Sequence, residues 1–140
     1  MFLLDTNVIS ELMRATPAPS VLSWFSTQDP STLYLSAVTE AELRTGIAIL
    51  PAGQRREGLR AALDATIAED FEGRILPFDT DAAKTYAEIA SMRRAAGRPI
   101  ADADCQIAAI ARAAGAVVAT RNLRDFEGCG VDLVNPWGGQ

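Results

Sequence analysis

Three acidic residues, Asp5, Glu42 and Asp104, lie at or near predicted helix starts and could together bind a divalent metal ion. The chain contains no histidine, so it lacks both the commonest general base near neutral pH and an imidazole ligand for zinc. Nucleophilic mechanisms that depend on a Ser–His or Cys–His pair are excluded for the same reason. Any hydrolysis must therefore be carried out by carboxylates, which favour a hard metal such as Mg²⁺ or Mn²⁺.

Each acid also has a purely structural interpretation. Asp5 could be a turn or cap residue, and Glu42 completes a Thr-x-x-Glu capping box with Thr39. Asp102 is the better candidate to cap the helix that contains Asp104, where negative charge is favourable. Several carboxylates that converge on one cleft, however, repel one another strongly unless a cation is present. The combination therefore favours a metal site.

Strands alternate with helices in the predicted order of elements. Strands are expected at residues 2–4, 33–36, 74–78, 116–119 and 131–134. Helices are expected at about 8–12, after a cap at Thr6 or Asn7, and at 19–26, 39–50, 54–70, 82–97 and 102–114. This alternation implies right-handed crossovers and a mostly parallel α/β sheet with helices on both faces.

In such a sheet, ligands bind beyond the carboxyl ends of the strands, at the point where the strand order reverses. Asp5 directly follows one predicted strand, and the loop with Asn122 and Asp125 directly follows another. Glu42 lies shortly after a third strand. Asp104 precedes a strand, so this rule does not place it.

The composition fits one domain of 140 residues, with 49% hydrophobic and 22% charged residues. The apolar-rich stretch 107–118 is too short to span a membrane, and no basic region precedes the first apolar residues. We therefore expect a cytoplasmic protein with no membrane association. Cys105 and Cys129 have no metal-ligand spacing and are expected to be reduced structural thiols. The net charge of −5 argues against strong sequence-independent nucleic-acid binding but does not exclude a nuclease.

Several segments carry a resemblance to a known family. They are Leu4–Asn7, Ser36–Leu43 with Gly46, Asp104–Ala109, Ala119–Asn122 with Asp125 and Phe126, and Asn135–Trp137. In these segments, and in their order and spacing, the chain resembles the PIN-domain ribonucleases, in particular the VapC-like toxins of bacterial toxin–antitoxin pairs. The resemblance reaches from residue 2 to 137. It implies one nuclease domain over residues 1–140, with a three-layer α/β/α fold and a five-stranded, mostly parallel sheet.

The resemblance also implies hydrolysis of RNA phosphodiester bonds with Mg²⁺ or Mn²⁺ as cofactor. Asp5, Glu42 and Asp104 match the family's metal-binding, catalytic acids. Relatives often have a fourth acid where this chain has Asn122, whose amide oxygen can bind a metal but adds no charge. Asp125, three residues later, could compensate, and one metal ion is a safer expectation than two.

Other residues and partners follow from the same resemblance. Thr6 and Thr120 match small hydroxyl residues that support the acids by hydrogen bonding. Apart from the resemblance, Arg44, Arg121 and Arg124 lie near the proposed cleft and are candidate phosphate contacts, although Arg44 could instead pair with Glu40 on its own helix. The family further implies a homodimer and a small antitoxin that blocks the cleft and tethers the pair to operator DNA. Aromatic residues that could lie in an interface, or equally fill the core, are Trp24, Phe25 and Trp137.

Two alternatives remain. A phosphatase that forms an aspartyl-phosphate at Asp5 would need an acid two residues later, and position 7 is Asn. Its intermediate would also need a lysine, and the chain's single lysine, Lys84, is poorly placed. The second alternative is a PIN fold with weak or no catalysis that only binds RNA or protein. The intact acids argue against it, whereas Asn122 is compatible with it.

Overall fold

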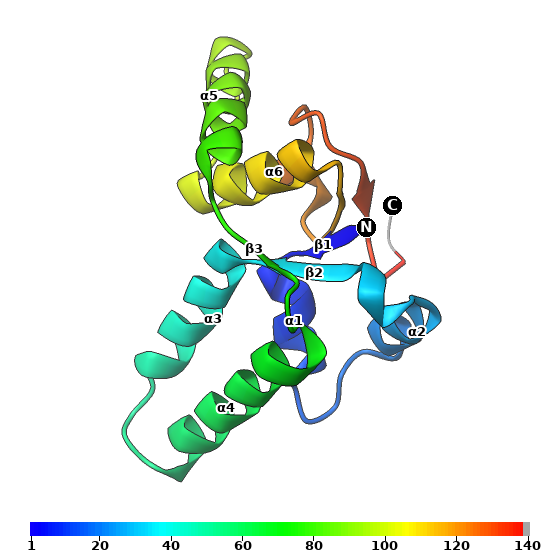
Figure 1. Cartoon of the computed structure of the whole chain (residues 1–140), viewed down its shortest axis with the longest axis vertical. Coiled ribbons are helices and arrows are strands. Elements are labelled where there is room, and N and C mark those ends of the chain that lie inside the picture. Colours follow the sequence, from blue (N-terminus) through cyan, green and yellow to red (C-terminus); the bar gives the residue numbers. More distant parts are fainter. Residues whose placement is uncertain (139–140) are drawn as a thin grey trace.

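Five short strands form one all-parallel sheet in the computed structural model, which describes residues 1–138 (Figure 1). The strands are β1 (Phe2–Leu4), β2 (Leu33–Ser36), β3 (Ile75–Leu76), β4 (Val117–Ala119) and β5 (Leu133–Val134). Their order in the sheet is β3-β2-β1-β4-β5. Because the chain moves outward in one direction from β1 and then returns to β1's other side, the strand order reverses between β1 and β4.

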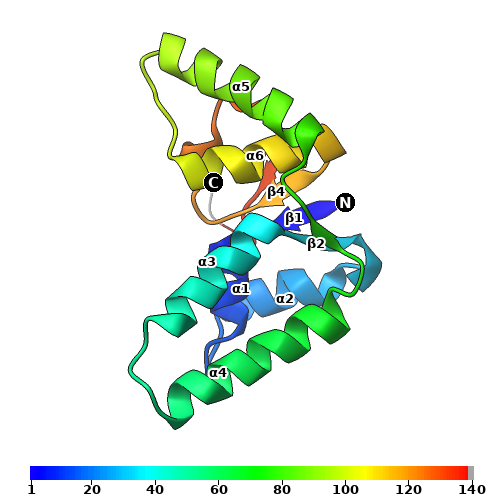
Figure 2. The same cartoon turned by 60° about the vertical axis from the view of Figure 1, so that its left-hand side comes forward.

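Six α-helices cover the two faces of this sheet. They are α1 (Thr6–Leu12), α2 (Pro19–Thr27), α3 (Ala37–Ala48), α4 (Gln54–Ala65), α5 (Thr80–Ala95) and α6 (Asp102–Ala114). Figure 2 shows α1 to α4 on one side of the sheet and α5 with α6 on the other. The predicted three-layer α/β/α fold is thus confirmed.

Two hydrophobic cores lie on opposite faces of the sheet, because successive strand side chains point in opposite directions. Leu3 and Val118 belong to the core under α5 and α6. Leu4 and Ala119 belong to the core under α1 to α4. All four side chains are fully buried, so the carboxyl ends of β1 and β4 are fixed from both sides.

The predicted elements differ from the structure mainly at their ends. Helix α6 has the predicted bounds and ends at Gly115, which adopts a left-handed conformation with φ of 69°. The strand predicted at 74–78 contains only two residues, because β3 is an edge strand and Pro77 cannot donate a hydrogen bond. The helix predicted at 54–70 ends at Ala65 and continues as a π-helical turn.

Other expectations can be compared directly with the described residues. Cys105 and Cys129 are buried free thiols, as predicted. Trp24, Phe25 and Trp137 are partly buried against the core under α1 to α4, which favours the core-filling interpretation. No helix within residues 1–138 has the length and apolarity that crossing a membrane requires.

Candidate metal centre

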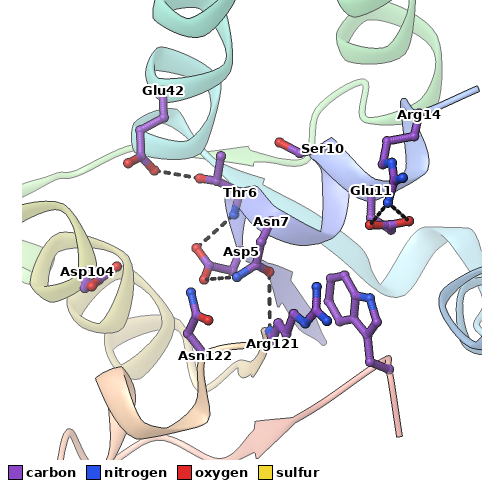
Figure 3. Close-up of a pocket in the computed structure, with 11 residues that line it drawn as sticks. Asp5, Thr6, Asn7, Ser10, Glu11, Arg14, Glu42, Asp104, Arg121 and Asn122 are labelled. Atoms are coloured by element: carbon purple, nitrogen blue, oxygen red, sulfur yellow. Dashed lines mark hydrogen bonds and ion pairs between the residues drawn. The ribbon is translucent and has the colours of Figure 1, made fainter. Parts of the chain in front are cut away.

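An open cavity of about 520 Å³ lies beyond the carboxyl ends of β1 and β4 (Figure 3). Its lining residues are Asp5, Thr6, Asn7, Ser10, Glu11, Arg14, Glu42, Asp104, Arg121, Asn122 and Trp137. The predicted acids thus line one cavity, although they come from three different elements. This cavity lies at the switch point in strand order, where open α/β sheets bind their ligands.

Asp5 is the N-cap residue of α1, because its Oδ1 accepts a hydrogen bond of 2.8 Å from the Thr6 N–H. The prediction that Thr6 or Asn7 caps this helix is wrong, since the helix begins directly after Asp5. The other carboxylate oxygen accepts hydrogen bonds from the Thr120 hydroxyl at 2.7 Å and from the Asn7 amide at 3.3 Å. Asp5 is only 5% exposed, and burial raises its pKa despite these bonds.

Glu42 lies in the second turn of α3 and takes no part in a capping box. The helix begins at Ala37, and the hydroxyl of Ser36 caps it by accepting a 2.9 Å hydrogen bond from the Thr39 N–H. The predicted Thr39–Glu42 capping box is therefore wrong, because Ser36, the last residue of β2, is also the N-cap residue of α3. Glu42 instead accepts a 2.6 Å hydrogen bond from the Thr6 hydroxyl. Its carboxylate is directed into the cavity without serving the helix terminus.

Asp104 lies in the first turn of α6, where the helix dipole favours negative charge. The N-cap residue is Ala101, which makes no side-chain cap bond, so the prediction of Asp102 as the cap is wrong. Asp102 instead accepts a long hydrogen bond of 3.4 Å from the Tyr86 hydroxyl. Burial and nearby negative charge raise the pKa of Asp104 to about 6. The acids that contribute this charge are Asp5, Asp125 and Glu42.

Asn122 lines the cavity in the place of the expected fourth acid. Its backbone N–H donates a 3.0 Å hydrogen bond to the Thr120 hydroxyl, which in turn donates to Asp5. Asp125 lies one helical turn further, in a 3₁₀ helix (Leu123–Phe126), and does not line this cavity. It lines a neighbouring cavity of about 460 Å³. Its negative charge contributes to raising the pKa of Asp5.

Two of the arginines predicted to contact phosphate lie in different places. Arg121 lines the cavity. Arg44 does not, because its guanidinium forms ion pairs of 2.8 Å with Glu40 and 2.8 Å with Asp64. The i,i+4 pair with Glu40 was the alternative interpretation of Arg44, and the structure supports it.

The cavity is also lined by two charged residues, Glu11 and Arg14, that the sequence did not indicate. Glu11 accepts a 2.8 Å hydrogen bond from the Ala18 N–H and bonds of 3.2 Å from the Arg14 guanidinium. The bond from Ala18 is the main cause that lowers the pKa of Glu11. Glu11 therefore fixes the turn between α1 and α2, and Arg14 brings a cation to the rim.

Arg93 holds the loop behind the site and was not recognised in the sequence. It is 7% exposed, and its guanidinium donates to the backbone carbonyls of Arg98 at 2.7 Å, Asp125 at 3.1 Å and Glu127 at 3.0 Å. No ion pair within residues 1–138 includes it. Its carbonyl partners follow it by 5 to 34 residues, so no local pattern could have revealed them.

Replacing Arg93 by methionine is expected to lower the free energy of unfolding by about 3 kcal/mol, because three carbonyls lose a charged donor. Urea unfolding followed by circular dichroism measures this change. Arg94→Met, on the exposed neighbouring position of the same helix, removes an equal charge and is expected to change the stability by less than about 0.5 kcal/mol. Equal stabilities of the two variants would show that Arg93 does not hold the loop.

The donor set of the cavity suits a hard divalent cation. Asp5, Glu42, Asp104 and the Asn122 amide offer oxygen ligands, which are the ligands that Mg²⁺ and Mn²⁺ prefer. The fourth carboxylate in the lining, Glu11, is bound by Arg14 and the Ala18 N–H. Within residues 1–138, no three acidic or cysteine side chains are already gathered as a ligand set. Mg²⁺ usually keeps several water molecules and binds one or two carboxylates directly, so a compact cluster of three is not required.

Comparisons with known proteins show the family of the chain and the similarity of its fold. Residues 2–128 match the family model of the PIN domain. The chain is 48% identical to the VapC ribonuclease Y4jK of Sinorhizobium fredii, over 98% of both chains. It is 44% identical to toxin FitB of Neisseria gonorrhoeae, over 98% of this chain and 99% of that protein. The solved structure of FitAB bound to an IR36 DNA fragment contains a chain that superposes with a TM-score of 0.94 at 42% identity, over 100% of this chain and 98% of that one.

Proposed function

The chain belongs to the PIN-domain family, and from this we propose that it is a metal-dependent ribonuclease, the toxin of a toxin–antitoxin pair. The observation that carries the proposal is that Asp5, Glu42 and Asp104 line one cavity at the switch point of the sheet. The relatives named as a VapC ribonuclease and as toxin FitB, aligned over nearly their whole length, support it.

In this proposal Asp5, Glu42 and Asp104 hold one Mg²⁺ or Mn²⁺ ion, with some ligands contributed through water. The pKa of Asp104 is raised first by burial and then by the negative charge of neighbouring acids, and this second cause supports the assignment because a cation would balance that charge. Asn122 replaces an acid and supplies no fourth negative charge. A single divalent ion therefore matches the charge of the site better than two.

The chain's own residues position the reaction. When bound, the ion activates a water molecule and stabilises charge that develops on the phosphoryl group. Thr120 and Asn7 fix the carboxylate of Asp5, and Thr6 fixes that of Glu42. Arg121 supplies positive charge in the lining of the cavity, where RNA phosphates can approach despite the negative net charge, whereas the charge of Arg14 is paired with Glu11.

A partner protein belongs to the proposal. FitB occurs in the FitAB complex bound to DNA, and we infer that this chain likewise assembles with a small antitoxin that covers the cavity and binds operator DNA. The net charge of −5 makes the chain by itself a poor binder of DNA, so the partner would supply the DNA contacts. A homodimer remains a prediction.

The second candidate function is a binding module without catalysis, which Asn122 in the place of an acid favours. The two candidates differ in their response to metal. If the acids hold an ion, Mn²⁺ at about 100 times its Kd stabilises the fold by about 2.7 kcal/mol and raises the Tm by roughly 5–10 °C.

Thermal unfolding of the purified chain in Mn²⁺, in Mg²⁺ and in EDTA measures this response, with ionic strength matched by KCl. The Asp5→Asn variant is expected to show no shift. An unchanged Tm in both metals would support the binding module and exclude the proposed metal centre.

A further inference from the structure

The cavity of the proposed ribonuclease has two chemically different ends. Asp5, Glu42 and Asp104 provide the acidic end, whereas Arg121 and Trp137 line the same cavity without adding negative charge. Figure 3 shows the side chain of Arg121 extending away from Asp5, while Glu42 and Asp104 lie on the other side of Asp5. A strand of RNA whose scissile phosphate lies at the acidic end can therefore place a neighbouring nucleotide near Arg121, within the same cavity.

Arg121 and Trp137 are in direct contact. The guanidinium of Arg121 lies over the indole ring of Trp137, 5.1 Å from its centroid. This distance is typical of a cation–π interaction. Arg121 is exposed, whereas Trp137 is partly buried against the core under α1 to α4, so the indole supports the guanidinium from the protein side.

Both residues are anchored through their backbones. The Arg121 N–H donates a 3.3 Å hydrogen bond to the side-chain oxygen of Asn7, whose amide nitrogen donates to Asp5. The Trp137 N–H donates a 2.9 Å hydrogen bond to the side-chain oxygen of Asn135. The pair is therefore built into the fold and tied to the acidic end through Asn7.

The guanidinium of Arg121 keeps its charge available. No ion pair within residues 1–138 includes Arg121. Its charge contributes to lowering the pKa of Glu11, but the Glu11 carboxylate is bound by Arg14 and the Ala18 N–H. Unpaired bases of single-stranded RNA stack on aromatic rings and on the planes of arginine side chains. A supported, uncommitted guanidinium beside the proposed metal site has this chemistry.

We propose that Arg121, supported by Trp137, is the platform on which the base next to the scissile phosphate stacks, an inference that rests on the proposed ribonuclease function. Arg121 then contributes a flat surface as well as a positive charge. The platform requires the planar guanidinium, whereas a simple phosphate contact would require only a cation.

Binding of a short, fluorescently labelled single-stranded RNA in EDTA tests the platform independently of cleavage. We expect Arg121→Lys, which keeps the charge but loses the plane, to raise the Kd by about 10-fold, since one stacked base typically contributes between about 5- and 150-fold. Trp137→Ala is expected to have a similar effect, and Trp137→Phe a smaller one. The matched charge control is Arg60→Ala, on the surface of α4, where Arg60 pairs with Glu57.

An RNA that lacks one base identifies the contact. Wild-type protein is expected to lose about 10-fold in affinity when the base beside the cleaved bond is absent, whereas Arg121→Lys loses nothing further. Equal Kd values for wild type, Arg121→Lys and folded Trp137→Phe would overturn the platform. The same holds if Arg121→Lys binds like wild type and only Arg121→Gln, which removes the charge, weakens binding, since Arg121 would then contact phosphate or a protein partner. Normal RNA binding without any cleavage in Mn²⁺ would contradict the proposed enzyme but not the platform.

Discussion

Replacing Asp5 by asparagine is expected to lower the rate of RNA cleavage in Mn²⁺ by about 100-fold or more while the fold remains intact. Changes in residues that only orient metal ligands already cost about 10- to 100-fold, so loss of a ligand charge should cost at least as much. Asparagine is the suitable replacement because it is also a good N-cap residue. Its side-chain oxygen can still accept the hydrogen bond that Asp5 accepts from Thr6.

Initial rates on a labelled RNA, with circular dichroism to verify folding, measure this effect. Asp132→Asn, in the exposed loop before β5, removes the same charge and is expected to cleave like wild type. Equal rates for Asp5→Asn and Asp132→Asn would remove Asp5 from the proposed site.

Replacing Asp104 by asparagine is expected to have opposite effects with and without metal. Burial and the neighbouring acids raise the pKa of Asp104 from 3.8 to about 6. The folded chain therefore binds this proton more tightly than the unfolded chain, and the resulting stability, present below about pH 4, is lost as the pH rises through about 6. At neutral pH in EDTA the ionised side chain is destabilising, so Asp104→Asn should be more stable by about 1 kcal/mol, allowing for the partial exposure of Asp104.

With Mn²⁺ the order reverses, because the variant has lost a ligand and gains no stabilisation from the ion. Urea unfolding in EDTA at several pH values, and thermal unfolding in Mn²⁺, measure the two effects. Asp102→Asn, on the same helical turn, is the matched control. It is expected to lose a favourable interaction with the helix dipole of roughly a few tenths of a kcal/mol and to be stabilised by Mn²⁺ like wild type. A variant Asp104→Asn that is less stable than wild type in EDTA, or that responds normally to Mn²⁺, would contradict this assignment.

The layers of the fold could be predicted because they depend on local patterns. The apolar residues of β1 and β4 alternate between two buried cores, and the apolar face and final glycine of α6 define a helix from 102 to 114. Helix starts were less predictable, because several adjacent residues can cap. Ser36 and Thr39 both carry a hydroxyl, and only the backbone shows that the helix begins after Ser36.

The site was predictable only in part. Asp5 could be placed at a strand end because it directly follows Phe2–Leu4. Glu42 could be placed near a second strand end because it follows the strand at 33–36 by a few residues. Asp104 was a candidate by its residue type, but the strand-end rule could not place it because it precedes a strand. It reaches the cavity because α6 packs across the sheet. The contact of Arg121 with Trp137 joins two loops that follow different strands, so it depends on strand order rather than on sequence spacing.

The central claim is that one divalent ion, held by Asp5, Glu42 and Asp104, enables this chain to cleave RNA. The most direct test titrates metal-free protein with Mn²⁺ and measures, in the same samples, bound Mn²⁺ by electron paramagnetic resonance and the rate of RNA cleavage. We predict that the rate rises in proportion to the occupancy of one ion per chain and falls to the background in EDTA. Cleavage that persists at full rate in EDTA, or Mn²⁺ that binds without any cleavage, would contradict the account.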